Sequence, residues 1–267
     1  MLVMIARDQL PILGAGGLLH PARKSTRVAP PSTCETVMFA AEGVNLAGWY
    51  CRTPGQRRGT VIYLHGIADN RGSGAGLVGR FTSTGFDVVA YDSRAHGDSG
   101  GDACTYGFYE KDDLRRVIDR VAHGAIVLLG TSLGAAVALQ HAARDSRITG
   151  VVAAESFSDL RTVASERAPF FFTRGAIEKA FALAEQQAHF KVDEVSPVAA
   201  ATAITVPVLV IHGAADADTP PVHAERLFAA LAGPKRLILV PGAGHNGSLR
   251  GDVWGEIERW VETLVPR

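Results

Sequence analysis

The sequence has no excess of charge of either sign. Lys and Arg together number 27, and so do Asp and Glu, which leaves a formal net charge of zero with histidine neutral. A neutral chain generates no overall field that would attract a phosphate backbone or an anionic membrane surface. Nucleic-acid binding is therefore not expected as the main activity.

The chain also lacks a long uninterrupted apolar run. Its apolar N-terminal stretch is broken by Arg7 and Asp8, and the uncharged residues that follow include Pro11 and several glycines. A membrane-spanning helix needs about 20 apolar residues, and a secretory signal needs a basic start before a clean apolar middle. We expect no integral membrane span, and we predict that residues 1–33 form an N-terminal arm that packs on the body of the protein.

Cysteine is scarce. Cys34, Cys51 and Cys104 lie far apart, and no two of them form a C-x-x-C pair. Isolated cysteines usually behave as small buried hydrophobic residues, so the favoured interpretation is three free thiols. A bridge between Cys34 and Cys51 would require their segments to pair as neighbouring strands. Free thiols are typical of a reducing compartment, which predicts a cytoplasmic protein.

What the sequence does contain is a regular alternation of short apolar runs and helical patterns. Two β-rich runs flank Glu42-Gly43 and predict a hairpin. Further apolar runs are nearly continuous, which is typical of strands buried on both faces of a parallel sheet. They are residues 60–66, 86–92, 125–130, 148–155, 206–213 and 235–242. Helical patterns occupy residues 110–123, 133–145, 221–233 and 251–265. The predicted fold class is α/β, a mostly parallel eight-stranded sheet opened by an antiparallel hairpin, with helices on both faces.

Residues 157–200 interrupt this alternation. They contain no good strand pattern but hold six of the eleven phenylalanines. We interpret them as a short helical cap inserted into a core formed by residues 34–156 and 201–267. Each phenylalanine could equally be an ordinary core residue. The predicted pocket residues of the cap are Phe157, Phe170, Phe171, Phe172 and Phe181.

The most informative motif is Gly130-Thr131-Ser132-Leu133-Gly134, which follows the apolar run "AIVLL" and precedes "AAVAL". A G-x-S-x-G sequence between a strand and a helix is typical of a nucleophile elbow, in which glycines permit a strained turn that exposes the serine hydroxyl. The start of the following helix supplies an N–H and the positive end of a dipole. We therefore predict that Ser132 is a catalytic nucleophile.

A serine nucleophile of this kind needs an acid and a histidine later in the chain, in that order. Asp216 follows an apolar strand in "IHGAADADTP", and His245 follows another in "LVPGAGHNGSL". Asp218 competes with Asp216, although the register against His212-Gly213 and Pro220 favours Asp216. Glu155, at the end of an earlier strand, is a more distant alternative.

The predicted oxyanion hole combines the backbone N–H groups of Leu133 and Ile67, the latter in the loop after "VIYLHG". His65 in the same loop is interpreted as a structural, hydrogen-bonded histidine. In "YDSRAHGDSGG" we expect Arg94, His96 and Asp98 to organise the loop beside the nucleophile rather than to contact substrate.

Together, "VIYLHG", "VVAYDSRAHGDSGG", "YGFYEKDDLRRVI", "LLGTSLGAAVAL", "VPVLVIHGAADADTP" and "VPGAGHNGS" resemble the α/β-hydrolase superfamily. The sequence is most similar to its small-capped serine esterase and acyl-hydrolase branch, which is related to peptidase-like and cephalosporin-deacetylase-like members. The resemblance spans residues 35–265 and implies Ser132 as nucleophile, His245 as base and Asp216 as orienting acid.

The sequence therefore predicts a serine carboxylesterase that cleaves short-chain or aryl esters through an acyl-enzyme, with a small-molecule ester as its partner. A thioesterase, an amidase or peptidase, and a non-catalytic binding module with the same fold remain alternatives. The run Gly74–Gly79 formally matches G-x-G-x-x-G, but it lies too far beyond its strand to bind a dinucleotide. No cluster has metal-ligand spacing, so neither a cofactor nor a metal is expected.

Overall fold

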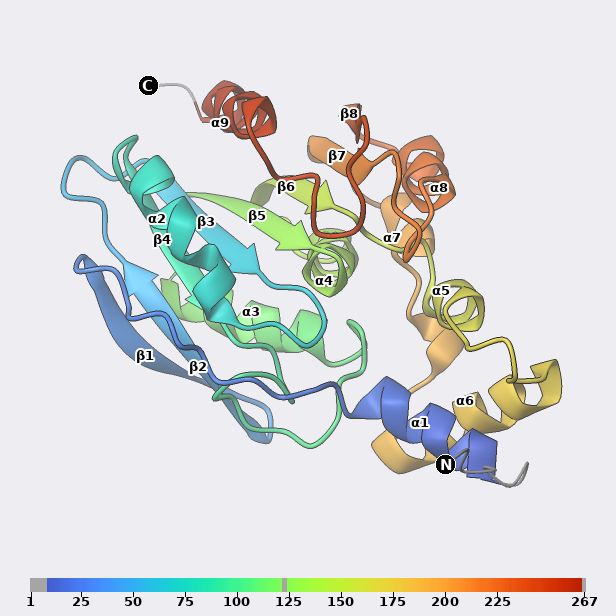
Figure 1. Ribbon diagram of the computed structural model, residues 1–267. Coiled ribbons are helices and arrows are strands. Elements are labelled where there is room, and N and C mark those ends of the chain that lie inside the picture. Colours follow the sequence, from blue (N-terminus) through green and yellow to red (C-terminus); the bar gives the residue numbers. More distant parts are fainter. Residues whose placement is uncertain (1–8, 122–123, 266–267) are drawn as a thin grey trace.

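The computed structural model describes residues 9–121 and 124–265, and Figure 1 shows a single twisted sheet with helices on both faces. Across the sheet the strand order is β1-β2-β4-β3-β5-β6-β7-β8. β2 is antiparallel to both β1 and β4, and all later neighbours are parallel, which confirms the predicted fold class. The strands of the described chain are β1 (Cys34–Ala41), β2 (Val44–Cys51), β3 (Gly59–Leu64), β4 (Phe86–Tyr91), β5 (Ala125–Thr131), β6 (Ile148–Ala154), β7 (Val208–Gly213) and β8 (Lys235–Val240).

The helices divide between the two faces of the sheet according to their apolar stripes. On one face α3, α4 and α8 contribute Leu114, Val137 and Leu227 to a common core, and on the other α2 and α9 contribute Phe81 and Val261. The α-helices are α1 (Leu10–Leu19), α2 (Ala75–Thr82), α3 (Glu110–Val121), α4 (Leu133–Ala142), α5 (Leu160–Glu166), α6 (Arg174–Ala188), α7 (Pro197–Ala201), α8 (Val222–Ala230) and α9 (Asp252–Leu264), with short 3₁₀ turns η2 (Arg71–Gly74) and η3 (Val192–Glu194). Every helical pattern singled out in the sequence thus forms a helix within the described part of the chain.

The interpretation of three free thiols is wrong. Cys34 and Cys51 are directly opposite each other in the β1–β2 ladder, and they form a disulfide. The antiparallel register of β1 and β2 brings the two thiols together. The spacing of the two cysteines in the sequence does not by itself indicate this pairing. Cys104 remains a free thiol and is buried. The inference of a reducing, cytoplasmic compartment rested on free thiols and loses that basis.

The expectation that the apolar runs are buried on both faces holds for β3, β4 and β7 but is wrong for β8. Val240 is the one buried residue of β8, and Leu239 is 40% exposed. β8 lies at the edge of the sheet, where it has a neighbour on one side alone. Its apolar composition therefore reflects strand propensity more than burial.

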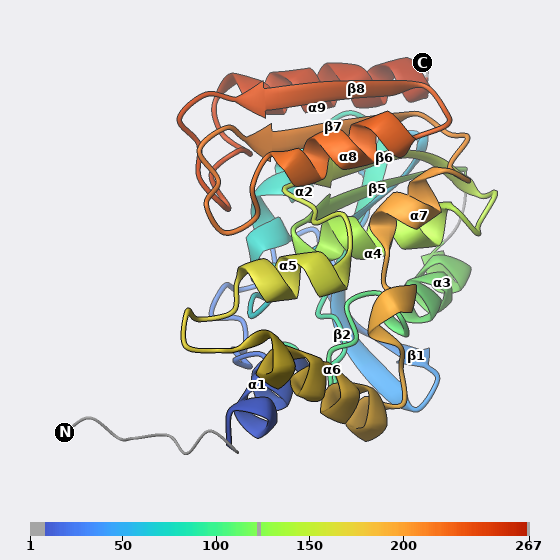
Figure 2. The same ribbon diagram turned by 90° about the vertical axis from the view of Figure 1, so that its right-hand side faces the viewer.

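The N-terminal arm packs against the body of the protein. α1 lies alongside α6 at the bottom of the molecule, in contact with the helices inserted between β6 and β7 (Figures 1 and 2). Residues after α1 are fixed by hydrogen bonds from the Arg23 guanidinium to the carbonyl oxygens of Ser99 and Gly101. Residues 1–8 of the predicted arm lie outside the described residues. No helix in the described part of the chain is both long and apolar enough to cross a membrane.

The segment between β6 and β7 contains α5, α6, η3 and α7. We refer to α5 and α6 as the cap helices, because they lie beyond the sheet, next to α1 (Figure 2). α7 contacts the core helices α4 and α8 instead. The predicted cap boundary at residue 200 therefore falls within α7.

Candidate active site

Ser132 occupies a strained turn between β5 and α4. Its φ of 49° and ψ of −112° lie outside the helix and strand regions, which is costly for a residue that carries a side chain. Glycine is required on both sides of it. A Cβ on Gly130 would overlap the backbone of Gly134, and a Cβ on Gly134 would overlap the carbonyl of Leu64. The local sequence therefore forces a tight passage from strand to helix, and the serine lies at its apex.

Ser132, His245 and Asp216 form a continuous hydrogen-bonded chain, although they are far apart in the sequence. The Ser132 hydroxyl donates to Nε2 of His245 over 3.0 Å, and Nδ1–H of His245 donates to Oδ2 of Asp216 over 2.8 Å. The three residues follow β5, β7 and β8, whose carboxyl ends meet at one edge of the sheet. An imidazole held by a carboxylate at Nδ1 has Nε2 free to accept the serine proton.

The loop after β7 distinguishes Asp216 from its competitor. Asp216 is buried, and its Oδ1 accepts the N–H groups of Asp218 and Thr219, which leaves Oδ2 for the histidine. Asp218 is exposed. His212 donates Nε2–H to the carbonyl of Thr219 at 2.7 Å, and burial lowers the pKa of His212, so this histidine stays neutral and supports the loop.

Glu155, the other alternative acid, follows β6, packs against the loop that carries His245 and has a different role in the structure. Its carboxylate accepts the backbone N–H groups of Asn246, Gly247 and Ser248, at 2.6 to 3.1 Å. These three residues directly follow His245. Glu155 therefore fixes the backbone that carries the imidazole, and makes no hydrogen bond to the imidazole itself in the described structure.

The two predicted oxyanion donors lie beside the serine. Leu133 is the first residue of α4, and Ile67 lines the same cavity as Ser132 and His245. Within the described part of the chain, neither backbone N–H donates to another protein group. Free N–H groups next to a nucleophile are suited to stabilising a developing negative charge on oxygen.

The structure agrees with a bracing role for the loop around residues 91–101. His65 is fully buried, donates Nδ1–H to the carbonyl of Gly66 at 2.7 Å and accepts the N–H of Ser93 at Nε2. Burial, reinforced by the adjacent ring of His96, lowers the pKa of His65 to about 4. Arg94 makes a bidentate ion pair with Asp113, both hydrogen bonds being 2.7 Å long.

Asp92 and Asp98 attach the same loop to η2. The guanidinium of Arg71 pairs with both carboxylates, and Asp92 also accepts the N–H groups of Arg71 and Asp98. These contacts hold the loop in place without directing a charged group at Ser132. In the run Gly74–Gly79, Gly74 ends η2 and the other residues form the start of α2.

An apolar cavity of about 580 Å³ adjoins the serine site. Ile67 and Arg167 line both this cavity and the hollow of about 460 Å³ that contains Ser132 and His245, so the two spaces are neighbours. The apolar cavity lies between α1, the cap helices and the body of the protein. Its volume is within the range of small-molecule binding sites.

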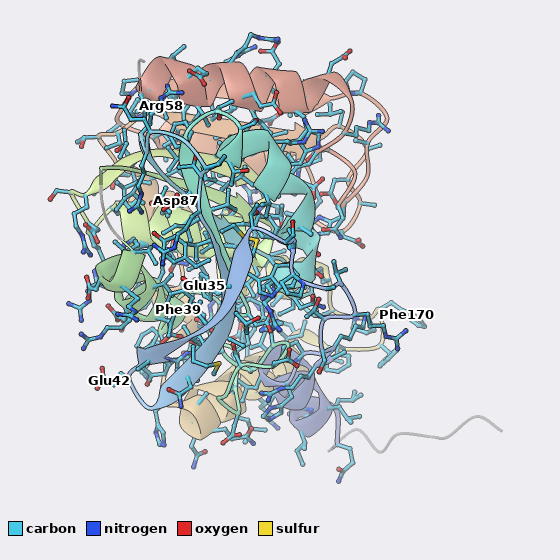
Figure 3. All side chains as sticks on the ribbon, turned by 90° about the vertical axis from the view of Figure 1, so that its left-hand side faces the viewer. Glu35, Phe39, Glu42, Arg58, Asp87 and Phe170 are labelled. Atoms are coloured by element: carbon cyan, nitrogen blue, oxygen red, sulfur yellow. A yellow bond between two sulfur atoms is a disulfide. The ribbon has the colours of Figure 1, made fainter. Side chains whose placement is uncertain are left out.

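The predicted cap phenylalanines divide into two groups. Phe171, Phe172 and Phe181 line the apolar cavity. Phe157, shortly after β6, does not line the cavity. Its side chain is buried and packs edge-on against the ring of Tyr106. Phe170 is 99% exposed at the tip of a turn, and Figure 3 shows it pointing away from the body.

Arg167 is a residue of the site that the sequence did not single out. It lies at the end of α5, donates Nε–H to the carbonyl of Asp218 at 2.8 Å and donates a second hydrogen bond to the hydroxyl of Thr219. It thus joins the cap to the loop that carries Asp216. One arginine among many carries no sequence signal of this role, because the contact depends on how the cap folds back.

A second serine–histidine–carboxylate set lies between α5 and α8. His223 accepts the N–H of Ser158 at Nδ1 and donates Nε2–H to Glu166 over 2.8 Å. Ser158 is fully buried, so an ester could not reach its hydroxyl. This set anchors the cap to the core.

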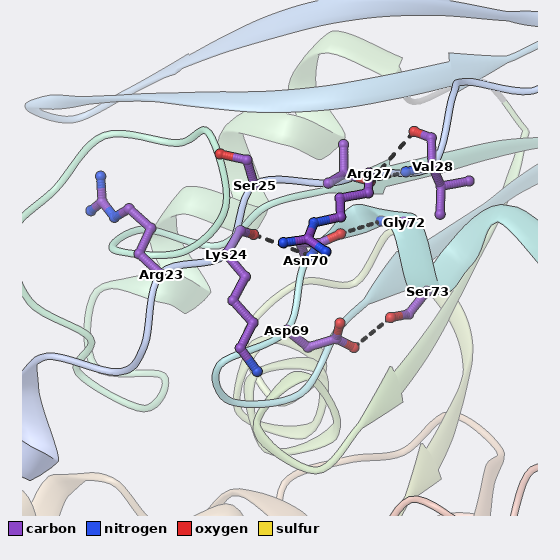
Figure 4. A pocket seen from close by; sticks show the side chains of 10 residues that line it. Arg23, Lys24, Ser25, Arg27, Val28, Asp69, Asn70, Gly72 and Ser73 are labelled. Atoms are coloured by element: carbon purple, nitrogen blue, oxygen red, sulfur yellow. Dashed lines mark hydrogen bonds between the residues drawn. The ribbon is translucent and has the colours of Figure 1, made fainter.

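A hollow of about 850 Å³, lined mostly by polar and charged residues, lies between residues 23–28 and 69–73 (Figure 4). The side-chain amide of Asn70 donates to the carbonyl of Lys24 and accepts the N–H of Gly72, while the hydroxyl of Ser73 donates to Asp69. No histidine or cysteine is among the residues that line it. These contacts attach the N-terminal arm to the loop that carries Ile67.

The chain is similar to known protein families. A family model described as alpha/beta hydrolase fold matches residues 59–197, and one described as TAP-like protein matches residues 178–253. The uncharacterized protein YqkD of Bacillus subtilis (strain 168) is 32% identical over 222 residues, which cover 78% of this chain and 72% of YqkD.

Solved structures share the fold. The Pyrococcus furiosus esterase Pf2001 superposes with a TM-score of 0.71 at 22% identity, covering 92% of this chain and 97% of the esterase. The Pyrococcus horikoshii acylaminoacyl peptidase gives a TM-score of 0.69 at 14% identity, covering 88% of this chain and 42% of the peptidase. At these identities the likeness concerns the fold alone.

Proposed function

The chain belongs to the α/β-hydrolase fold family, and we propose that within it this protein is a serine hydrolase that cleaves carboxylic esters. The observation that carries the proposal is the chain of hydrogen bonds from Ser132 through His245 to Asp216, at 3.0 and 2.8 Å. It supplies a nucleophile, a base and an orienting carboxylate in reacting distance of one another. A protein that only binds a ligand would not need these three residues to be aligned by hydrogen bonds.

The reaction follows from the arrangement. Ser132 Oγ attacks the ester carbonyl carbon while His245 Nε2 takes the serine proton, and the carboxylate of Asp216 stabilises the imidazolium that forms. The N–H groups of Ile67 and Leu133 donate to the oxyanion of the tetrahedral intermediate. His245 then gives its proton to the departing alkoxide, which leaves as the alcohol and generates the acyl-enzyme.

Deacylation uses the same groups. A water molecule gives a proton to His245 Nε2 as its oxygen attacks the acyl carbon, and the second tetrahedral intermediate collapses to release the carboxylic acid. The proton returns from His245 to Ser132 Oγ. No step requires a metal or a redox cofactor.

The apolar cavity is suited to bind the acyl group of the ester, and its lining favours an uncharged acyl group. Among the residues that line it, Arg167 is the charged one, and its guanidinium already binds the loop after β7. Apolar lining with few polar groups favours aliphatic or aryl acyl groups. Esters of this kind are therefore the proposed substrates, and thioesters and amides share the same mechanism as alternatives.

The proposal is tested by kinetics and by covalent labelling. We expect hydrolysis of p-nitrophenyl esters that Ser132→Ala abolishes, and a fluorophosphonate adduct that mass spectrometry places on Ser132. Ser83→Ala, at an exposed serine after α2, is the matched control and should retain both. Full activity in Ser132→Ala, or no adduct on Ser132, would overturn the proposal. Thioester and amide analogues run in parallel identify the preferred leaving group.

A further inference from the structure

The N-terminal helix α1 forms one side of the apolar cavity. Leu13, Gly14, Gly17 and Leu18 of α1 line it, opposite residues of the cap helices. α1 precedes the sheet in the chain and belongs to neither the core nor the cap insertion. We propose that α1 is the outer wall of an acyl-binding cavity, and that Gly17 keeps its rim open to acyl groups that are longer than the cavity. This inference rests on the proposed ester hydrolysis.

The glycines of α1 serve different purposes. A Cβ on Gly14 would lie 2.8 Å from Cβ of Ala180 and 3.0 Å from the ring of Phe172, so Gly14 permits α1 to approach α6 closely. A Cβ on Gly17 would have no heavy atom within 4 Å. Glycine is a poor helix former, and packing explains neither Gly17 nor Gly16, but of these two only Gly17 lines the cavity.

The rim of the cavity lies at Gly17. Leu13, Gly17 and Phe171 all line the cavity, and all three are exposed to solvent. The cavity therefore opens to solvent between α1 and the turn that carries Phe171. Absence of a side chain at Gly17 widens this opening.

The path from the nucleophile to the rim passes Ile67 and Arg167, which line both the cavity and the serine hollow. The acyl chain of an ester bound at Ser132 can extend between these two residues toward α1. Arg167 is held by the loop after β7, so its guanidinium stays at the entrance.

The interior of the cavity favours a plain hydrocarbon chain. Tyr106 contributes a hydroxyl, but that hydroxyl donates to the carbonyl of Leu18 at 3.0 Å. Its hydrogen is therefore already used, and the same bond attaches α1 to the body. A hydroxylated or charged acyl chain would lose its hydration there without an equivalent partner. Within the proposed substrates, the cavity therefore favours esters whose acyl group carries no polar or charged substituent.

The test compares p-nitrophenyl butanoate with p-nitrophenyl decanoate. Each buried methylene raises binding about fourfold, so a side chain that blocks a few methylenes has a large effect. We expect Gly17→Leu to lower the decanoate-to-butanoate ratio of kcat/KM by about tenfold or more. Gly16→Leu is the matched control, since Gly16 also has no heavy atom within 4 Å of its Cβ position but does not line the cavity. It should leave the ratio unchanged.

A second variant acts in the opposite direction. Leu18→Ala removes part of the wall and keeps the backbone carbonyl that Tyr106 binds. It should raise kcat/KM for a branched acyl chain relative to the straight chain of the same length. Thermal unfolding of all variants checks that they fold. Identical ratios in the wild type, Gly17→Leu and Gly16→Leu would overturn the role of α1. Absence of turnover of every ester by the wild type would instead overturn the proposed function, so the two failures are distinct.

Discussion

The carboxylate of Glu155 accepts the backbone N–H of Asn246 at 2.6 Å, and it connects the end of β6 to the loop after β8. Both residues have a positive φ, 56° for Glu155 and 63° for Asn246. Non-glycine residues in this region persist where surrounding contacts over-determine them, and such residues cluster at functional sites. The position of His245 is therefore set by the buried carboxylate of Glu155, just after β6, as well as by Asp216.

Replacing this anion should impair positioning of His245. In Glu155→Gln one acceptor oxygen is replaced by an NH₂ group that would face backbone N–H donors. Hydrogen bonds to charged groups contribute about 1.5–3 kcal/mol each, so we expect a loss of about 2 kcal/mol in the free energy of unfolding. We also expect kcat to fall about tenfold or more while KM changes less, because Glu155 itself lines neither substrate cavity.

Urea unfolding and steady-state kinetics measure the two effects. Glu225→Gln, on the exposed side of α8, is the control and should change neither. A folded Glu155→Gln protein with the wild-type kcat would show that the histidine loop holds its geometry without this carboxylate.

The two acids of the loop after β7 should respond very differently to amide substitution. In Asp216→Asn the new amide can donate to His245 Nδ1, which would leave the proton on Nε2 and prevent it from accepting the serine proton. A comparable change in a well-studied serine protease lowers kcat about 10⁴-fold. Asp218 is exposed and makes no side-chain contact to the imidazole in the described structure, so Asp218→Asn should stay within about tenfold of the wild type.

Ester hydrolysis by both variants, with circular dichroism as the check on folding, measures this contrast. A large loss in Asp218→Asn together with near-normal Asp216→Asn would reverse the assignment of the acid.

The sequence predicted the parts of this protein that depend on local pattern. Apolar runs located the strands, and the G-T-S-L-G turn between a strand and a helix located Ser132, because both signals lie within a few adjacent residues. Asp216 could be chosen over Asp218 because its register against Pro220 reflects the same tight loop that buries it.

Features that depend on distant contacts were not predictable in the same way. The Cys34–Cys51 pair requires the hairpin register, and the exposure of β8 requires knowledge of which strand ends the sheet. The opposite environments of Phe170 and Phe181 depend on the direction in which the cap turns back. The sequence pattern gives no signal that separates the exposed Phe170 from the buried Phe181.

The disulfide should stabilise the first hairpin measurably. Cys34 and Cys51 are separated by 17 positions, and closing a loop of this length is worth about 3 kcal/mol in the chain-entropy model. We expect Cys34→Ser with Cys51→Ser to lower the melting temperature, and a reductant to lower that of the wild type but not that of the double variant.

Thiol alkylation under denaturing conditions gives an independent count. One reactive thiol, Cys104, is expected without reductant and three with it. Three thiols in the unreduced protein would contradict the disulfide.

Acid should destabilise the protein through His65. Its pKa is lowered to about 4 by burial, whereas the unfolded chain has the usual value of about 6.5. Between these values the unfolded chain binds a proton that the folded chain excludes. Stability is therefore complete above about pH 6.5 and is lost as the pH falls toward 4, by up to about 3 kcal/mol from this residue.

Urea unfolding at several pH values between 7 and 4.5 measures the slope. His65→Asn removes the buried imidazole, so it should lower stability at pH 7 but give a shallower loss on acidification than the wild type. His189→Asn is the matched control, because His189 is exposed and its positive φ is one that asparagine tolerates. The control should keep the wild-type slope, and an equally steep slope in His65→Asn would assign the acid sensitivity to other buried groups, such as His141 or His212, whose pKa values burial also lowers.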